Sequence, residues 1–319
     1  ADIVAGVEAG GTTFNAIVGR RGPDGCAEVL ATVNIPTTAP EETLALVAAA
    51  LADNFPKDSG DTFAAVGVAS FGPIDLNKES KTYGYITTTP KQRWQNADVL
   101  GSLRSLLLSR GLVTEATPFG FDTDVNAAAL AMAVHFSSSS ASSRPLHSLA
   151  YATVGTGIGV GLYSHNTLVH GASHPEAGHI YVPLARADVA AGFEGTCPWH
   201  GACLEGLCAT AAIAKRAGVP SAALGELSDS EEVWETVAHY LAHLCISLTL
   251  TMAPQVIVLG GGVMQRSCLL PAIRRHFTQL LNGYVAVAAV QDLGRYIVGP
   301  PTAVPPGVLG AVHLALAAQ

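Results

Sequence analysis

Apolar residues follow two spacings along the first half of the chain. Short apolar runs bounded by turn residues predict strands over 3–7, 14–18, 29–35, 64–69 and 119–121. Apolar positions three or four residues apart predict helices over 41–54, 99–110 and 127–135. The first half is therefore expected to combine strands with amphipathic helices.

The second half repeats this layout. Apolar runs predict strands over 149–154, 158–163 and 256–259, and helical spacing predicts helices over 231–252, 269–281 and 308–318. Each half opens with two strands joined by a turn built from Gly and Thr, although the halves share no visible sequence identity. Between them, residues 137–143 are six Ser and one Ala, which predicts a flexible insertion of unknown role.

Composition and charge exclude several classes of protein. Of the 319 residues, 49% are hydrophobic and 13% charged, so the chain is expected to fold, with room for two domains. No apolar run reaches the roughly 18–20 residues of a membrane-spanning helix, and no basic region of a signal peptide opens the chain. We therefore expect a cytoplasmic protein without membrane contact. A net charge of −8 and 17 scattered Lys and Arg argue against nucleic-acid binding.

The two Gly/Thr turns are candidate phosphate-binding loops. The chain has no P-loop pattern, and the glycines at 155–161 lie between two strands, unlike a dinucleotide-binding loop. Glycines let backbone N–H groups approach an anion, and Thr12 and Thr156 add hydroxyl donors. Either turn alone is consistent with simple hairpin closure. Two such turns together favour polyphosphate binding.

Two acidic residues end the strand predicted over 119–121. Asp122 and Asp124, with Asn126, precede a helix, so one of them can be an N-cap. A carboxylate at a strand end can also take a proton from a substrate hydroxyl. The pattern alone leaves these two roles equally open.

Histidine and cysteine residues form the most specific pattern. The spacing H-x17-C-x2-H-x2-C has the donor set of a tetrahedral zinc site, with ligands His179, Cys197, His200 and Cys203. No H-E-x-x-H pattern is present, so we expect a structural metal that holds a long loop. Glu176 and Glu205 flank these residues and are either sugar-binding carboxylates or solvated surface groups. The remaining cysteines, at 26, 208, 245 and 268, are expected in the core.

Taken together, these motifs resemble those of the ROK family of sugar kinases and sugar-responsive repressors, most closely its bacterial-type fructokinase branch. The resemblance extends from Val4 to the last predicted helix. It implies an α/β, actin-like ATPase (ribonuclease H-like) fold with two domains around a cleft. The domains would be residues 1–122, joined by the C-terminal helix 307–319, and residues 123–306. The repressors carry an N-terminal helix-turn-helix, for which no residues precede the first strand here.

The resemblance also implies a role for each motif. Asp124 is similar to the catalytic aspartate, and Glu8 to an outer-shell magnesium residue. The phosphates and nucleotide would be bound by Gly10, Gly11, Thr12, Thr13, Gly155, Thr156, Gly157, Gly260, Gly261 and Gly262. The sugar would be bound by Gly72, Pro73, Asp124, Glu176, His179 and Glu205. The segments 71–75 and 85–94 would form the other wall of the sugar site.

Four positions depart from the usual family pattern. Glu8 stands where Asp is common, and Thr13 where Lys is common, which removes one possible phosphate contact. His200 replaces a zinc-binding Cys, as in the fructokinase branch. Thr123 replaces an Asn that the family's glucokinases use to bind the sugar, which disfavours glucose.

The function expected from the resemblance is Mg-ATP-dependent phosphorylation of a hexose, most simply D-fructose at its 6-hydroxyl, by a zinc-containing homodimer. One alternative is a kinase for mannose, glucose or an N-acetylhexosamine. The other is a catalytically silent, sugar-binding regulator. A sugar panel would separate the kinases, and ATP consumption would exclude the regulator.

Overall fold

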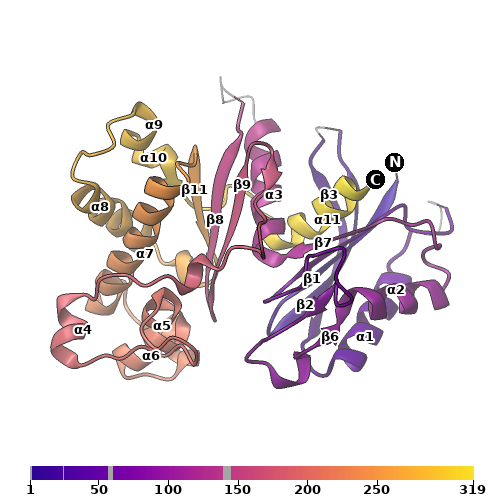
Figure 1. The fold of residues 1–319 in the computed structure, drawn as a ribbon, viewed down its shortest axis with the longest axis horizontal. Coiled ribbons are helices and arrows are strands. Elements are labelled where there is room, and N and C mark those ends of the chain that lie inside the picture. The colour runs from indigo at the N-terminus through magenta and orange to yellow at the C-terminus, as the bar shows by residue number, and fades with distance from the viewer. Residues whose placement is uncertain (1, 24, 57–59, 139–144) are drawn as a thin grey trace. The chain divides into compact units, whose positions relative to one another are not determined.

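The computed structural model describes residues 2–23, 25–56, 60–138 and 145–319, and the chain divides into two compact units. Unit 1 comprises residues 1–146, 166–174 and 302–319, and unit 2 comprises residues 147–165 and 175–301. Both units combine strands and helices, and the last helix of the chain lies in unit 1 with the N-terminus (Figure 1).

The sheet of unit 1 has five strands in the order β3-β2-β1-β4-β7. The pairs β1–β2 and β2–β3 are antiparallel, whereas β1–β4 and β4–β7 are parallel. The bounds are β1 Ile3–Ala9, β2 Thr13–Arg21, β3 Ala27–Pro36, β4 Val66–Ser70 and β7 Phe119–Thr123. The two parallel pairs place the carboxyl ends of β1, β4 and β7 side by side at one edge of the sheet.

Helices cover both faces of this sheet, which explains the continuous apolar runs of β1 and β4. Helices α1 (Pro40–Asp53) and α2 (Val99–Ser109) share one buried cluster with Ile3 and Val7. On the other face, α11 (Pro306–Ala318) shares a cluster with Val4 and α3 (Asp124–Ser138).

The second sheet has the order β10-β9-β8-β11-β12, with β8–β11 and β11–β12 parallel and β8–β9 antiparallel. Its strands are β8 Ser148–Val154, β9 Ile158–Ser164, β10 Thr167–Leu168, β11 Val256–Gly260 and β12 Ile297–Val298. The core of unit 2 is closed by α7 (Glu232–Thr251) and α8 (Leu269–Leu281), together with α5 (Leu204–Cys208) and α6 (Thr210–Ala217).

Every strand and helix predicted from apolar spacing is present, with bounds that differ by a few residues. Helix α3 begins at Asp124 instead of residue 127, because the Oγ1 of Thr123 accepts a hydrogen bond from the backbone N–H of Asn126 at 3.1 Å and so caps it. The elements without a prediction are short: α4 (Arg186–Ala191), α5, α6, α9 (Ala288–Gln291), α10 (Leu293–Tyr296), β5 (Tyr85–Ile86), β6 (Ala97–Asp98), β10 and β12. The Ser-rich insertion falls mostly outside the described residues.

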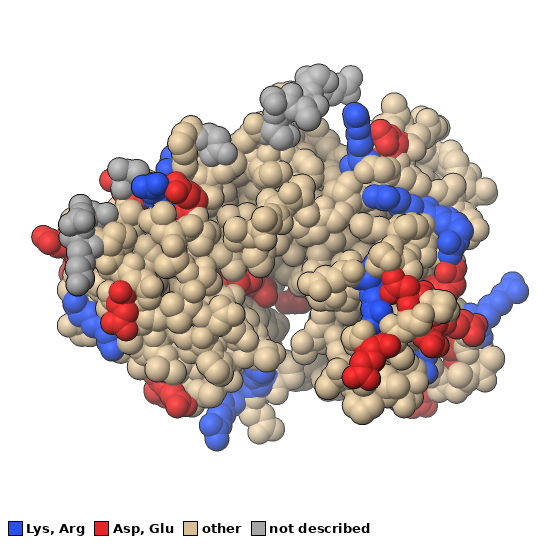
Figure 2. Space-filling view, turned by 180° about the vertical axis from the view of Figure 1, so that it is seen from behind, with Lys and Arg blue, Asp and Glu red and all other residues tan. Residues whose placement is uncertain are grey.

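The compact units do not follow the division expected from the sequence, which placed residues 123–306 in one domain. Helix α3 packs against α11, and both belong to unit 1, so unit 1 extends through residue 146. No helix in the described ranges has the length and apolar character needed to cross a membrane. On the face seen in Figure 2, basic side chains lie singly or in small groups among acidic and uncharged ones, without a continuous basic stripe.

Candidate active site and metal site

The carboxyl edge of the unit 1 sheet gathers three of the motifs. Register pairs Glu8 with Ala69 and Ala69 with Asp122, so the chain leaves three adjacent parallel strands at the same level. The segments that follow are the first Gly/Thr turn, the Gly72–Pro73 segment and the start of α3 at Asp124. In sheets of this kind, ligands bind at the carboxyl ends of the strands.

The first Gly/Thr turn is tight and closely supported. The N–H of Gly10 donates to the carbonyl of Thr13 at 3.0 Å, and a Cβ on Gly10 would lie 2.5 Å from that oxygen. The hydroxyl of Thr37, after β3, donates to the carbonyl of Gly10 at 2.8 Å. Thr12 is exposed at the tip of the turn. The turn therefore has backbone N–H groups and a hydroxyl available at its tip.

Lys91 lies beside this turn, and the sequence reasoning missed it. A Cβ on Gly11 would meet the Lys91 side chain at 2.9 Å. The buried Trp94 anchors the Lys91 segment: its Nε1–H donates to the carbonyl of Thr38 at 2.9 Å, and its ring packs on Phe14 at 5.0 Å between centroids. The available signal was a single Lys three positions before an aromatic anchor, which does not reveal the partner of that Lys in the fold.

Glu8 occupies a buried position below the turn. Its Oε2 accepts a hydrogen bond from Nδ2 of Asn15 at 2.7 Å, and its Oε1 lies against Gly307 in the first turn of α11. Burial raises the pKa of Glu8 above its ordinary value. The Oδ1 of Asn15 is also buried and has no hydrogen-bond partner in the described structure. Two oxygen-bearing side chains thus meet here, with one oxygen unsatisfied.

The structure distinguishes the two aspartates at the end of β7. Asp122 is buried and accepts hydrogen bonds from the N–H of Thr123 at 2.7 Å and from Nδ2 of Asn126 at 2.8 Å; its Oδ2 pairs with Nε2 of His170 at 2.8 Å. Asp124 is only partly buried, and its Oδ1 accepts the N–H of Val125 at 2.9 Å. Since Thr123 caps α3, neither aspartate is needed as the N-cap. Asp122 has a structural role, whereas Asp124 is the more accessible carboxylate.

The Gly72–Pro73 segment is held by a buried histidine. His174 Nε2 accepts a hydrogen bond from the N–H of Ile74 at 3.1 Å, and a Cβ on Gly72 would lie 3.5 Å from the His174 ring. The carbonyl of Pro73 accepts two hydrogen bonds from Thr87, at 2.8 and 3.0 Å. The two predicted wall segments, 71–75 and 85–94, are therefore bound directly to each other.

In unit 2, two glycine turns meet at the carboxyl ends of β8 and β11. Gly261 has φ +92°, and a Cβ there would collide with the backbone of Val154. The 260–262 turn therefore packs directly on the segment before Gly155. The N–H of Gly155 donates a hydrogen bond to the carbonyl of Gly157 and so closes the turn. The hydroxyl of Thr210, in α6, donates to the carbonyl of Gly155 at 2.7 Å and connects the turn to that helix. The five predicted nucleotide-binding glycines of this unit and Thr156 thus lie at one edge of this sheet.

Glu205 connects the second turn to the zinc-site loop. Its Oε2 accepts the N–H of Ile158 at 2.9 Å and would lie 2.6 Å from a Cβ on Gly157. Glu176 lies at an exposed position, but the packing around its carboxylate and the negative charge of Glu205 raise its pKa to about 7. Glu205 therefore lies close enough to Glu176 to influence the ionisation of Glu176.

The four residues of the predicted zinc site converge. Their ligand atoms all lie within 4.8 Å of one another, and the recorded pairs range from 3.3 Å between Nδ1 of His179 and Nδ1 of His200 to 3.8 Å between Sγ of Cys197 and Nδ1 of His179. Zinc bonds of about 2.0–2.3 Å to nitrogen and sulfur give tetrahedron edges of about 3.3–3.8 Å. The donor set and the spacing both fit a zinc ion.

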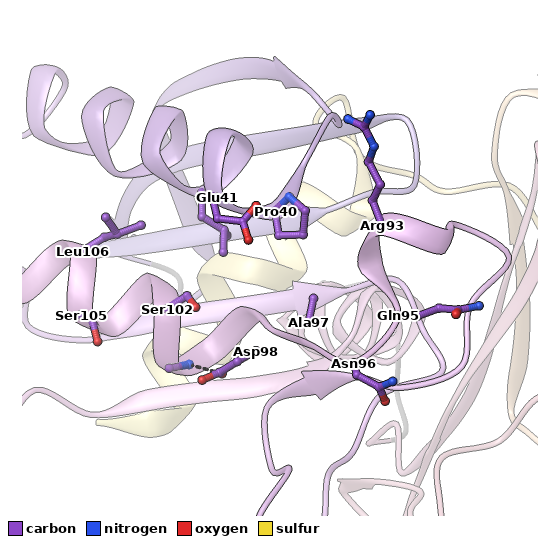
Figure 3. A pocket seen from close by; sticks show the side chains of 12 residues that line it. Pro40, Glu41, Arg93, Gln95, Asn96, Ala97, Asp98, Ser102, Ser105 and Leu106 are labelled. Atoms are coloured by element: carbon purple, nitrogen blue, oxygen red, sulfur yellow. Dashed lines mark hydrogen bonds between the residues drawn. The ribbon is translucent and has the colours of Figure 1, made fainter.

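A cavity of about 720 Å³ lies elsewhere in unit 1 (Figure 3). It opens between the beginnings of α1 and α2, with Pro40, Glu41, Asp98 and Ser102 among its lining residues. Arg93, from the predicted wall segment 85–94, lines it, whereas the residues predicted to bind phosphate or sugar do not.

Comparison with known proteins identifies the family. The ROK family model matches residues 4–318. The chain belongs to the ROK family. A fructokinase of Streptococcus mutans is 42% identical over 298 residues, covering 93% of this chain and 91% of its own. A fructokinase of Zymomonas mobilis is 39% identical, covering 98% and 96%.

Solved structures agree on the fold. A ROK family glucokinase from Streptomyces griseus, in complex with glucose and AMPPNP, superposes with a TM-score of 0.69 at 21% identity and covers 99% of both chains. The fold class expected from the sequence, an α/β actin-like ATPase fold, is confirmed, as is the resemblance to the ROK family and its fructokinases.

Proposed function

We propose that this ROK protein transfers the γ-phosphoryl group of ATP to the 6-hydroxyl of a hexose, with D-fructose as its preferred substrate. One structural observation carries the proposal: the first phosphate turn, the Gly72–Pro73 segment and Asp124 leave three adjacent parallel strands at the same edge. The fructokinase names of the relatives from Streptococcus mutans and Zymomonas mobilis support the choice of sugar.

Asp124 is the general base in this proposal. Its carboxylate accepts the proton of the 6-hydroxyl as that oxygen attacks the γ-phosphorus in line and the ADP oxygen leaves. The support is the contrast in burial, because Asp124 is only partly buried, whereas Asp122 is buried and held by Thr123, Asn126 and His170.

Backbone N–H groups and hydroxyls of both turns bind the phosphates. Unit 1 supplies Gly10, Gly11, Thr12 and Thr13, and unit 2 supplies Gly155, Thr156 and Gly157, with Gly260, Gly261 and Gly262 against the nucleoside. Lys91 supplies a positive charge beside Gly11 and so replaces the lysine that is lacking at Thr13.

Glu8 and Asn15 fit an outer-shell magnesium site. Magnesium prefers oxygen ligands and retains several waters, and the unsatisfied Oδ1 of Asn15 beside the Glu8 carboxylate can accept hydrogen bonds from them. When bound, the ion neutralises charge on the β- and γ-phosphates.

Gly72, Pro73, Asp124, Glu176, His179 and Glu205 bind the sugar. Carboxylates suit this task because each oxygen accepts hydrogen bonds from sugar hydroxyls. His179 can serve both sites, because its Nδ1 faces Cys203 and His200 while Nε2 remains for the sugar.

The metal is a structural zinc ion held by His179, Cys197, His200 and Cys203. Four protein ligands complete a tetrahedron, so no coordination position remains for a reactive water. Burial raises the pKa of the Cys203 thiol to about 11, and zinc binding displaces its proton. The ion positions the loop that carries Glu176 and Glu205.

We propose a homodimer, supported by large apolar side chains exposed near the zinc site: Tyr181, Leu184, Val189 and Trp199. Because the reaction consumes ATP, we place it in the cytoplasm. Light scattering during gel filtration tests the dimer: a monomer at micromolar concentration would exclude it.

The deciding experiment measures kcat/KM for fructose, mannose, glucose and N-acetylglucosamine at saturating Mg-ATP, by coupled ADP release. We expect fructose to exceed glucose, because the side chain of Thr123 is too short to replace an Asn amide at a pyranose hydroxyl. An unsatisfied polar group can discriminate by as much as roughly 10⁴-fold. A glucose value equal to or above that of fructose would assign a glucokinase or broad hexokinase, and absence of ATP consumption with every sugar would indicate a regulator.

A further inference from the structure

Three histidines gather on the two long helices of unit 2, away from the zinc-site loop. His239 and His243 are four residues apart on α7, and His276 comes from α8. The ring centroids of His239 and His243 are 4.7 Å apart, and those of His239 and His276 are 5.4 Å apart. All three are partly buried, so solvent reaches them. Helices α7 and α8 are neighbours in Figure 1.

A carboxylate orients the third histidine. Nε2 of His276 lies 2.8 Å from Oε1 of Glu235, which also pairs with Arg275. These two partners lower the pKa of Glu235, so the carboxylate is ionised and can only accept hydrogen bonds. Nε2–H of His276 therefore donates to this carboxylate, which leaves Nδ1 as the ring nitrogen that can face a ligand. Carboxylates bonded to histidines in this way are typical of metal sites.

We propose that His239, His243 and His276 form a second metal site, which binds a divalent transition ion such as Zn²⁺, Ni²⁺ or Cu²⁺. Two histidines at i and i+4 project from the same face of a helix, the arrangement that binds zinc in helical metal sites. Imidazole suits these three ions. Three protein ligands leave at least one coordination position for water.

The two α7 imidazoles have the nitrogen lone pairs that a metal needs. In the described structure, neither His239 nor His243 has a hydrogen-bond partner for its ring. Burial, together with the neighbouring imidazoles, lowers the pKa of both below the ordinary value of histidine. The rings stand edge to face, at 81° and 82°, and convergence requires rotation about χ2, a broad torsion in histidine.

A metal at this site would connect α7 to α8. Both helices contribute to the core of unit 2, including Leu241 and Ile273. An ion that binds only the folded arrangement stabilises it by mass action. The site differs from the Cys/His group because it contains no sulfur, which makes the two spectroscopically separable.

The test is a Co²⁺ titration of the full-length protein after metal removal. Cobalt bound at the Cys/His group should give sulfur-to-cobalt charge-transfer absorption, and a second equivalent should add visible d–d bands without further charge transfer. The double change His239→Gln with His243→Gln should lower the affinity for the second equivalent of Co²⁺ by at least about tenfold. The single change His276→Gln should also lower the affinity for this second equivalent.

His147→Gln is the matched control, because His147 is an exposed histidine of the same unit. This variant should retain the second equivalent. In zinc-loaded protein, whose Cys/His group is already occupied, added Ni²⁺ should raise the melting temperature of the wild-type and control proteins. It should not raise that of the double variant, whose fold is checked by circular dichroism. The proposal is overturned if wild-type protein binds no second ion, or if the double variant binds it unchanged. If the double variant does not fold, the His276→Gln titration decides by the same criterion.

Discussion

At the scale of single residues, the site depends on how neighbouring carboxylates are paired. Asp122 and Asp124 are two positions apart and have the same chemistry, yet Asp122 is buried and Asp124 is only partly buried. The carboxylate of Glu205 accepts a hydrogen bond from the Ile158 N–H, and its negative charge contributes to the raised pKa of Glu176.

Asp124→Asn should abolish turnover and leave sugar binding largely intact. The amide retains the shape of the side chain but cannot accept the hydroxyl proton, and loss of a general base costs about 10²–10⁴-fold in kcat. The measurement is kcat by coupled ADP release, together with sugar binding by calorimetry. Asp53→Asn, at the exposed end of α1, is the control and should be unchanged. More than a tenth of wild-type kcat in Asp124→Asn would exclude Asp124 as the base.

Sugar affinity should increase as the pH rises through about 7. Burial and Glu205 raise the pKa of Glu176 to about 7, and only the ionised carboxylate accepts hydrogen bonds with both oxygens. The same raised pKa contributes stability that is complete below the unfolded-state pKa and is lost as the pH rises through 7. The test is the pH dependence of KM for the sugar. Glu205→Gln should move the midpoint to lower pH; an unmoved midpoint would show that Glu176 is not the titrating group.

At the scale of elements, the loop from Pro175 to Glu205 lacks long regular structure. It contains one 3₁₀ turn, Ala177–His179, one short helix, α4, and the first two residues of α5, so its geometry depends on side-chain partners. Arg216 of α6 forms a salt bridge with the buried Asp188 of α4, at 2.8 Å, and the Cys/His group provides the second attachment.

Removing zinc should therefore destabilise unit 2 and lower activity only through the position of the sugar-binding carboxylates. We expect about one tightly bound zinc per chain by elemental analysis, and its loss in protein carrying both Cys197→Ser and Cys203→Ser. Melting temperature with and without chelator reports the stability. Cys26→Ser, in unit 1, serves as the control. Unchanged melting and full activity in the double variant would contradict a structural zinc.

At the scale of the whole molecule, the end of the chain completes the first unit. Helix α11 is almost entirely buried against the sheet formed by β1, β4 and β7, near the N-terminus (Figure 1). This close approach needs glycine on β4: a Cβ on Gly67 would collide with the carbonyl of Ala311 and meet the N of Ala315 at 2.5 Å.

Gly67→Ala should accordingly destabilise the protein by about 1–3 kcal/mol, because the added methyl meets helix backbone that cannot rotate away. Urea unfolding measures the change in the free energy of unfolding. Gly171→Ala, in the same unit with no atom within 4 Å of the added Cβ, should be close to neutral. Equal stability of the two variants would show that α11 can shift without cost.

The sequence alone determined the strands and long helices, from apolar spacing. It also predicted the two Gly/Thr turns as phosphate-binding loops, and it picked out the four His and Cys residues that converge in the fold. Only the tertiary structure brought Lys91 to Gly11, paired His170 with Asp122, and placed three histidines together on α7 and α8. It also showed that Thr123, and neither aspartate, caps α3. The physical reason is that the first three contacts join residues far apart in the sequence. In the fourth, neighbouring side chains compete for the same backbone N–H at the start of α3. Which contact forms is decided by packing across the sheets and helices, which local periodicity does not encode.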